Sequence, residues 1–228
     1  MAQTYPQKPF EAPAGATEIL LVRHGQSQAA DPDRPFDLVD GHGDPPLSEL
    51  GHQQAKAVGE RLRHEPIGAV YHTKLQRTLQ TATPLLGHSG HEPRLDPGLH
   101  EVFLGDWEGG LFRKMAAEDH PAIVRMRTEG EWGHIPGAET TEELRHRTVS
   151  AIVRIHSDHP DQRVAVFVHG GVIAALLHRA TGSRPFAFMG ADNGSIHHLV
   201  VHGDEWQLRR FNDTSHMGGF TAEGQGLT

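Results

Sequence analysis

Glu18-Ile-Leu-Leu-Val-Arg-His-Gly25 is the stretch that decides the fold. A short run of branched apolar residues ends abruptly in polar ones, which is typical of a buried strand with a polar end. The same pattern recurs at Arg163-Val-Ala-Val-Phe-Val-His-Gly170, and a shorter version, Gly68-Ala-Val-Tyr-His-Thr73, lies between them. Because a helix-like pattern follows each run, we expect a mainly parallel sheet that is covered on both faces.

Apolar residues at helical spacing, caps and turn residues place the other elements. They predict a helix capped by Ser48, a helix carrying Leu75 to Leu86, a short helix opened by Pro121, a helix with a Thr140/Glu143 capping box, a buried helix over 172–180, and a hairpin of residues 195–201 and 206–210. The expected fold class is therefore α/β. We predict a three-layer sandwich with a mainly parallel central sheet, helices on both faces and a C-terminal antiparallel hairpin.

Length and composition describe one globular domain. The chain has 228 residues, of which 36% are hydrophobic and 22% are charged, and no composition break divides it. We expect a single domain over residues 18–215, a flexible N-terminal segment of residues 1–17 and a tail of residues 216–228. No run of 18 apolar residues occurs, and the N-terminal segment has no apolar core, so we expect a cytoplasmic protein without a membrane partner. Homodimer formation stays open.

Charge and cysteine content limit the chemistry. Lys and Arg together number 21 against 29 Asp and Glu, and the net charge of −8 disfavours a broad grip on nucleic acid. With no Cys, the chain can form no disulfide, thiolate nucleophile or thiolate zinc site. An anionic substrate must therefore be held by a local pocket.

Three of the predicted strands end in polar, reactive residues: Arg23 and His24, His72 with Arg77 about one turn beyond, and His169. In α/β sheets, ligands bind beyond the carboxyl ends of the strands. Arginine matches the charged oxygens of a phosphoryl group, and a neutral imidazole can attack it and form a covalent intermediate. A second imidazole could donate hydrogen bonds, while the leaving oxygen would need an acid. The sequence thus predicts a phosphoryl-transfer site.

The ordered motifs resemble those of the histidine phosphatase superfamily, also called phosphoglycerate mutase-like proteins. Arg-His-Gly alone would be weak evidence for this resemblance. The full set of motifs in this order is specific to the family, and it covers nearly the whole chain after residue 17. The motifs are Leu21-Val-Arg-His-Gly25, Pro46-Leu-Ser-Glu-Leu-Gly51 with Gln54 and Ala55, Arg77-Thr-Leu-Gln-Thr-Ala82, Leu99-His-Glu101 with Gly105-Asp-Trp-Glu-Gly109, Val168-His-Gly-Gly171 and Asn193-Gly-Ser195.

The resemblance implies a role for five residues. His24 looks like the residue that becomes phosphorylated, and Arg23, Arg77 and His169 look like the rest of the phosphate pocket. Glu101 looks like the proton donor to the leaving oxygen and then the base for the attacking water. No metal and no cofactor are implied, since two Arg and two His supply the positive charge. The implied partner is a small phosphorylated substrate.

Further positions are implied or depart from the family pattern. Gly25 would let the backbone turn close to the phosphate, and Ser27 and Asn193 are candidates for positioning. Many family members carry Asn where this chain has Ala30, which puts one phosphate or substrate contact in doubt. The Ser common in the second motif is Thr73 here, which keeps a hydroxyl.

The expected function is that of a cofactor-independent phosphomonoesterase. Mutases carry a longer substrate-gripping motif beginning with Arg-His-Tyr, where this chain has Val102-Phe-Leu-Gly-Asp106, so the phosphatase branch is the closer likeness. A phosphoglycerate mutase is the nearest alternative, and a regulatory module that binds a phosphorylated ligand without turnover is another. A metallohydrolase is a more distant one. Asp106 and Glu108 lie near Glu101, and either could be the acid instead.

Three further histidines and four arginines are interpreted as surface residues without a role in the site. His197, His198 and His202 suggest a metal site, but alternation along a strand puts residues 197 and 198 on opposite faces. We interpret these three as surface histidines. Four arginines are interpreted as charges on solvated faces: Arg145, Arg147, Arg209 and Arg210.

Overall fold

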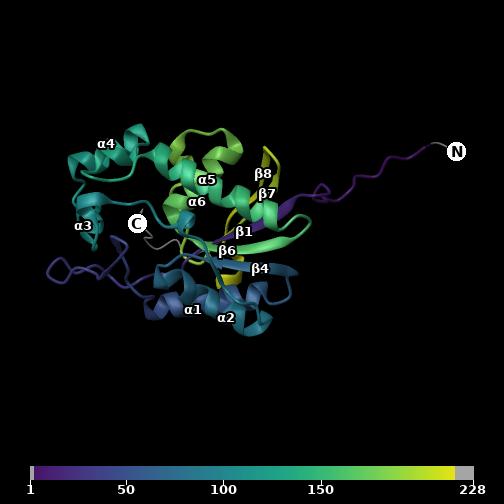
Figure 1. Cartoon of the computed structure of the whole chain (residues 1–228), viewed down its shortest axis with the longest axis horizontal. Coiled ribbons are helices and arrows are strands. Elements are labelled where there is room, and N and C mark those ends of the chain that lie inside the picture. Colours follow the sequence, from purple (N-terminus) through teal and green to yellow (C-terminus); the bar gives the residue numbers. More distant parts are fainter. Residues whose placement is uncertain (1–2, 219–228) are drawn as a thin grey trace.

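A six-stranded sheet forms the middle layer of the structure, a computed structural model that describes residues 3–218 (Figure 1). The strand order is β5-β4-β6-β1-β7-β8. The pairs β4–β5, β4–β6 and β1–β6 are parallel, whereas β7 is antiparallel to both β1 and β8. The strands are β1 (Thr17–Arg23), β4 (Ile67–His72), β5 (Arg94–Leu95), β6 (Arg163–Val168), β7 (Ile196–His202) and β8 (Glu205–Asp213). The predicted parallel sheet with a late antiparallel hairpin is confirmed.

Helices cover both faces of this sheet (Figure 1). One layer contains α1 (Glu49–Leu62) and α2 (Gln76–Ser89), and the opposite layer contains α5 (Thr141–Asp158) and α6 (Gly170–Thr181). Two shorter helices, α3 (Leu111–Ala117) and α4 (Pro121–Glu129), lie beyond one end of the sheet. Within residues 3–218, no helix combines the length and the apolar content that crossing a membrane requires.

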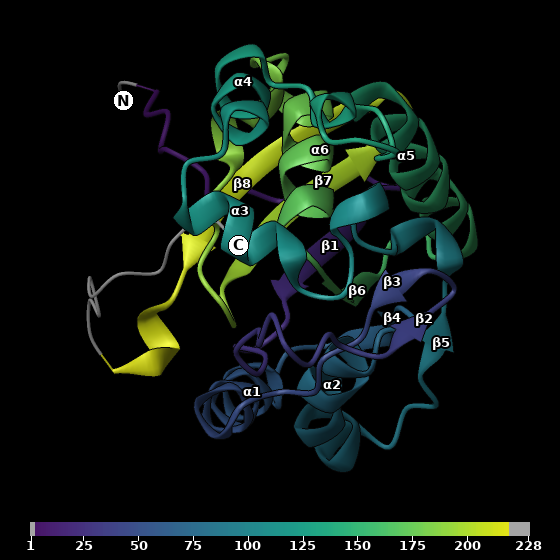
Figure 2. The same ribbon diagram turned by 90° about the vertical axis from the view of Figure 1, so that its left-hand side faces the viewer.

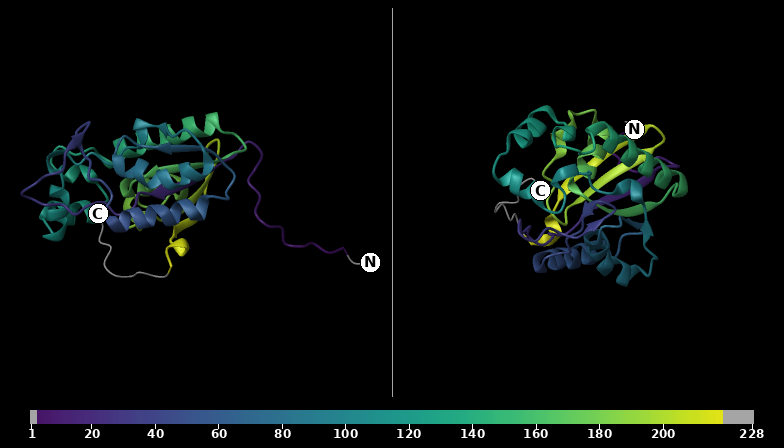
Figure 3. Two further views of the ribbon diagram at one scale, coloured as in Figure 1. Left: turned by 90° about the horizontal axis from the view of Figure 1, so that it is seen from below. Right: turned by 60° about the vertical axis from the view of Figure 1, so that its left-hand side comes forward.

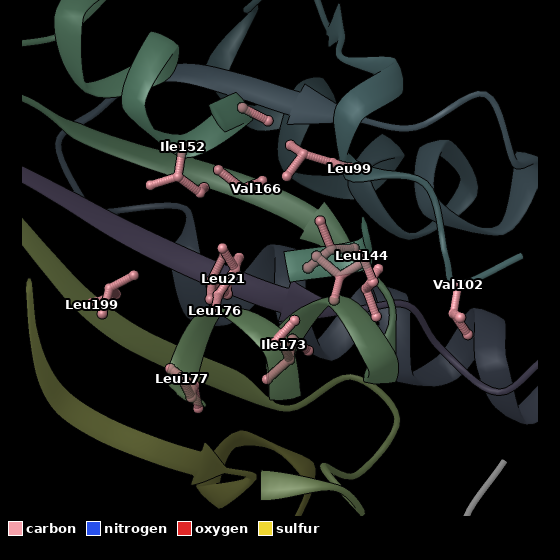
Figure 4. Close-up of a cluster of buried hydrophobic side chains, with 14 of the residues drawn as sticks. Leu21, Leu99, Val102, Leu144, Ile152, Val166, Ile173, Leu176, Leu177 and Leu199 are labelled. Carbon is pink, nitrogen blue, oxygen red and sulfur yellow. The ribbon is translucent and has the colours of Figure 1, made fainter. Parts of the chain in front are cut away.

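Alternation along the central strands builds two cores. Ile19 and Leu21 of β1 face the α5/α6 layer, while Leu20 and Val22 face α1 and α2. Figure 4 shows the first cluster, in which Leu21 lies among side chains of β6, α5 and α6. Full burial of one such aliphatic side chain stabilises the fold by about 1.5–3 kcal/mol. The opening stretch of the sequence therefore anchors both layers and fixes where its polar end emerges.

Helix starts and ends follow local chemistry. The predicted capping box is present, since the Thr140 hydroxyl accepts from the Glu143 N–H at 3.2 Å and the Glu143 carboxylate accepts from the Thr140 N–H at 2.8 Å. Ser48 caps α1 by accepting from the Gly51 N–H at 3.1 Å. Helix α2 contains Pro84 and continues past it to Ser89.

Several short elements lack a sequence signal. Residues 28–46 contain a small hairpin of β2 (Leu38–Val39) and β3 (His42–Gly43). Helix α3 has no fully buried residue and begins after Gly110, which has a φ of 104° and offers no side-chain cap, so its start has no polar signal in the sequence. Short 3₁₀ turns occur at η1 (Pro97–Leu99), η2 (Gly105–Trp107), η3 (Trp132–His134), η4 (Pro185–Phe188) and η5 (Ser215–Met217).

The first strand and the last short helix mark the two ends of the regular structure in the described residues. Strand β1 starts at Thr17, and the buried Thr17 hydroxyl donates to the His159 carbonyl at 2.8 Å. The exposed residues 3–12 run away from the domain (Figures 1 and 3). At the other end, η5 includes the first two residues assigned to the tail, and Met217 lines the central cavity. Positions 219–228 of the expected tail lie outside the described residues.

The interpretation of His197 as a surface histidine is wrong. Its ring is fully buried, accepts from the Asn212 N–H through Nδ1 at 3.1 Å, and lies 3.0 Å from the Ser195 hydroxyl through Nε2. Nδ1 carries no proton in this arrangement. Burial, followed by the charge of Arg23, lowers the pKa of His197 to about 3. The ring joins the end of β7 to β8 in its neutral form.

Buried neutral His197 predicts that stability falls on acidification. Below pH 6.5 the unfolded chain binds a proton that the folded chain does not, so the free energy of unfolding decreases as pH falls toward 3. Between pH 7.5 and 4.5 we expect His197 alone to remove about 3 kcal/mol, measured by urea denaturation. His197→Asn should flatten this slope, whereas His202→Asn on the exposed end of β7 should not. An unchanged slope in His197→Asn would contradict this account.

Candidate active site

Parallel strands β4, β6 and β1 are neighbours, so their carboxyl ends open onto one edge of the sheet. This edge brings together Arg23, the last residue of β1, with His24 directly after it, Thr73 after β4 and His169 after β6. Figure 2 looks onto this end, with α3 and the β2–β3 hairpin in front of the strands. The expected meeting of these strand ends is therefore present in the structure.

His24 is held as a neutral imidazole. Its Nδ1 donates to the Gly25 carbonyl at 2.7 Å, which leaves the lone pair on Nε2. The backbone carbonyl of His24 accepts from the Asn193 side-chain amide at 3.0 Å, and the backbone N–H of His24 donates to the Val168 carbonyl. Burial, followed by the positive charges of Arg77 and Arg23, lowers the pKa of His24 well below its usual range. At neutral pH the ring is therefore uncharged, with a free lone pair on Nε2.

Two buried guanidinium groups flank this imidazole. Arg23 donates to the Ala191 carbonyl. Arg77, in the first turn of α2, donates to the Gly43 carbonyl at 3.0 Å and lies 3.9 Å from the Asp44 carboxylate. Burial lowers the pKa of Arg77 to about 10, so the group stays charged at neutral pH. Both cations suit an anionic ligand better than an apolar one.

His169 faces His24 across the site, with ring centroids 5.2 Å apart. Its Nε2 lies 3.0 Å from the Thr73 hydroxyl, which itself lies 3.1 Å from the hydroxyl of Thr78. Its Nδ1 is buried and has no hydrogen-bond partner in the described part of the chain. Burial, followed by the charge of Arg77, lowers the pKa of His169 well below its usual range. A ligand oxygen at Nδ1 would complete its hydrogen bonding.

Glu101 lies against the start of α6. Its carboxylate accepts from its neighbour Val102 N–H at 2.9 Å and from the Gly171 N–H at 3.3 Å. A Cβ on Gly171 would come within 2.6 Å of the Glu101 carboxylate, so the second glycine of His-Gly-Gly makes room for it. The missing side chain of Gly171 therefore lets the Glu101 carboxylate lie against the start of α6.

Arg147 holds the backbone of the same loop. Its guanidinium donates to the carbonyls of Gly98, His100 and Glu101 and pairs with Glu139 at 2.6 Å. The interpretation of Arg147 as a solvated charge is therefore wrong. Three carbonyls bonded by one guanidinium keep the Glu101 loop in place.

The two rival acids are placed differently. Glu108 accepts from the Gly43 N–H at 2.7 Å and from the Leu104 N–H at 2.9 Å, so its carboxylate joins the loop to the β2–β3 hairpin. Asp106 is exposed and does not line the cavity. Glu101 and Glu108 both line the cavity, but of the three carboxylates Glu101 is the one that accepts a hydrogen bond from the start of α6, two residues after His169.

The other predicted positions lie close by. A Cβ on Gly25 would meet the Gly51 carbonyl at 2.4 Å, so the absent side chain lets α1 approach the loop after β1. Ser27 is buried and lines the cavity together with Asn193. Ala30 packs toward Gly110, where a Cβ would lie 3.0 Å from the Ala30 methyl.

Arg113 is the residue that sequence reasoning missed. It extends from α3 and donates to the Ser27 hydroxyl and to the Gln28 carbonyl, both at 2.7 Å. No motif marks it, because α3 itself has no sequence signal. In the sequence, Arg113 is marked only by its position four residues after the Gly105–Gly109 motif.

A cavity of about 1310 Å³ is lined by several of these groups, among them Arg23, His24, Arg77, Glu101 and Arg113, while His169 is fully buried behind its lining. Polar residues form its floor, whereas apolar side chains form much of its wall, including Phe36, Leu104, Trp107, Phe112 and Phe186. Within residues 3–218, no group of three His, Asp or Glu side chains is placed to hold a metal ion. The cavity can take a phosphoryl group together with a sizeable remainder.

Comparisons with known proteins agree with this geometry. Residues 19–214 match the model of the histidine phosphatase superfamily (branch 1). The chain is 33% identical to "Phosphoglycerate mutase-like protein 4" of Arabidopsis thaliana, covering 88% of this chain and 86% of that protein. It is 30% identical to the "Metal-independent phosphoserine phosphatase" of the same plant, with coverage of 88% and 83%.

A solved structure gives the same result. The native structure of a mycobacterial glucosyl-3-phosphoglycerate phosphatase superposes with a TM-score of 0.73 at 26% identity, covering 87% of this chain and all of that one. The predicted family resemblance is thereby confirmed. The chain belongs to the histidine phosphatase superfamily, branch 1, and with these phosphatase relatives it is an enzyme of the hydrolase class that acts on phosphate monoesters.

Proposed function

We propose that the protein hydrolyses a small phosphate monoester through a phosphohistidine on His24. One observation carries this proposal: His24, with a lone pair on Nε2, lines a cavity together with Arg23 and Arg77, and its ring lies 5.2 Å from that of His169, whose buried Nδ1 has no hydrogen-bond partner in the described residues. An anion placed there would satisfy all of these groups at once. The phosphoryl oxygens would be bound by Arg23, Arg77 and His169.

The first half-reaction forms the phosphohistidine. The Nε2 of His24 attacks phosphorus as the ester P–O bond breaks, and protonated Glu101 gives its proton to the leaving oxygen. The Nδ1–H bond to the Gly25 carbonyl stabilises the charge that develops on the imidazole. The alcohol then departs into the cavity.

The second half-reaction hydrolyses the phosphohistidine and regenerates the free enzyme. Glu101, now a carboxylate, takes a proton from water, whose oxygen attacks phosphorus while the N–P bond breaks. Inorganic phosphate leaves, and Glu101 is protonated again. No redox step and no further co-reactant is needed.

The phosphate clamp gives a specific prediction. Arg77→Lys should lower kcat/KM for p-nitrophenyl phosphate about a hundredfold, because an ammonium cannot offer the forked pair of N–H donors, and one lost transition-state donor typically costs about 3 kcal/mol. Arg63→Lys on the exposed end of α1 is the matched control and should be neutral. Near-normal kinetics for Arg77→Lys would mean that Arg77 contributes only charge.

Release of inorganic phosphate from a panel of metabolite phosphates, with and without a bisphosphate primer, tests the proposed function. We expect release without primer from at least one ester, and loss of that release in His24→Ala. Interconversion of phosphoglycerates without phosphate release would favour a mutase. Tight binding of phosphate esters with no turnover would favour a binding module.

A further inference from the structure

Arg113 places a third guanidinium at the cavity, outside every motif of the family. One η nitrogen donates to the Ser27 hydroxyl and the other to the Gln28 carbonyl, and the group lies 5.5 Å from the Phe36 ring centroid. Because Ser27 follows His24 by three residues and lines the same cavity, Arg113 is anchored directly beside the phosphate pocket.

The charge of Arg113 lacks a carboxylate partner. Its hydrogen bonds go to a hydroxyl and a carbonyl, and no Asp or Glu of residues 3–218 forms an ion pair with it. By contrast, Arg127, which also lines the cavity, pairs with Asp119 at 3.1 Å. Burial lowers the pKa of Arg113, in keeping with the cost of holding a cation away from water without a countercharge.

A charge count extends this point. Arg77 has the Asp44 carboxylate 3.9 Å away, and the charges of Glu101 and Asp192 act on Arg23, whereas no carboxylate of the described residues acts on Arg113. Since the Ser27 hydroxyl accepts from Arg113, its own proton is left to donate to a phosphate oxygen. Arg113 can therefore order Ser27 with one nitrogen and offer its remaining N–H groups to another part of the ligand.

We propose that Arg113 determines specificity by binding a second anionic group of the substrate, a carboxylate or a second phosphate, located a few bonds from the ester that is cleaved. This inference rests on the proposed function, because the first phosphate is taken to occupy the pocket of Arg23 and Arg77. Substrates with a neutral group at this place bind without a partner for Arg113.

Three probes that share a glycerol backbone test the inference. 3-Phosphoglycerate carries the carboxylate, glycerol 1,3-bisphosphate carries the second phosphate, and glycerol 3-phosphate is the neutral counterpart. Their competitive inhibition constants against p-nitrophenyl phosphate are measured in wild type and in Arg113→Gln. At least one anionic probe should bind wild type more tightly than glycerol 3-phosphate. Arg113→Gln should weaken that probe about 10- to 100-fold, and it should weaken glycerol 3-phosphate by a clearly smaller factor, because that probe loses only the support of Ser27.

A matched control separates local binding from general charge. Lys114→Gln removes the neighbouring positive charge, which pairs with Glu118 on the exposed side of α3, and should leave the anionic preference unchanged. Equal weakening of all three probes in Arg113→Gln would mean that Arg113 binds the transferred phosphoryl group, and the inference would be wrong. A wild type without anionic preference would overturn it as well.

Calorimetry gives the dissociation constants of the three probes without any turnover. The ratio of the anionic probe's constant to that of glycerol 3-phosphate therefore tests Arg113 separately from the proposed function. Absence of turnover in wild type would refute the phosphomonoesterase proposal but leave the binding ratios measurable. Turnover that depends on His24, with no loss of anionic preference in Arg113→Gln, would refute only the role of Arg113.

Discussion

His24→Ala should reduce turnover of p-nitrophenyl phosphate by on the order of 10⁴- to 10⁶-fold, because no other group would be placed to form the covalent intermediate. The variant should still bind inorganic phosphate, since Arg23 and Arg77 are anchored to the Ala191 and Gly43 carbonyls and not to the imidazole. Steady-state kinetics and phosphate titration by calorimetry measure the two effects.

Two results decide how His24→Ala is interpreted. His52→Ala, on the exposed side of α1, is the control and should be neutral. Activity of His24→Ala within tenfold of wild type would show that another nucleophile, or water itself, attacks the ester.

Glu101→Gln should slow the release of an alkyl alcohol by roughly 10²- to 10⁴-fold, because an alkoxide cannot depart without a proton. The amide keeps the shape of the side chain and one acceptor for the Val102 N–H. Release of p-nitrophenolate needs little protonation, so its first turnover should suffer much less. Rapid mixing isolates that turnover from the later hydrolysis of the intermediate.

The other two carboxylates supply the comparison for Glu101. Glu108→Gln weakens bonds to the Gly43 and Leu104 N–H groups, so we expect both leaving groups to be affected alike. Asp106→Asn, on an exposed side chain, should have little effect. If Glu101→Gln affects both leaving groups alike and one of these two variants shows the contrast, the acid is that other residue.

The central part of the fold and site could be predicted because it depends on regular geometry. An apolar run such as residues 19–22 must be buried on both faces, and parallel strands bring their carboxyl ends to one edge. Arg23, His24 and His169 therefore had to lie near one another wherever the helices ran. The neutral state of His24 could not be predicted, because it depends on burial and on the nearby guanidinium groups.

What the sequence could not predict depends on long-range contacts of polar side chains. Arg147 and the carbonyl of Glu101 are 46 residues apart, and Arg113 and Ser27 are 86 apart, so no local pattern links either pair. His197 lies on alternating strand β7, yet its burial depends on the neighbouring strand β8, whose Asn212 N–H donates to its ring. These side chains hold the loops around the motifs, and their roles emerge only once the chain is folded.

The phosphohistidine itself is the most direct test of the mechanism. Wild-type enzyme is mixed with a ³²P-labelled substrate, quenched within milliseconds in alkali and digested, and the labelled peptide is located by mass spectrometry. We predict label on the peptide containing residue 24, at His24, stable to base and lost in acid, and absent from His24→Ala. Label on Ser27, or turnover with no trapped label even when Glu101→Gln slows hydrolysis of the intermediate, would contradict the account.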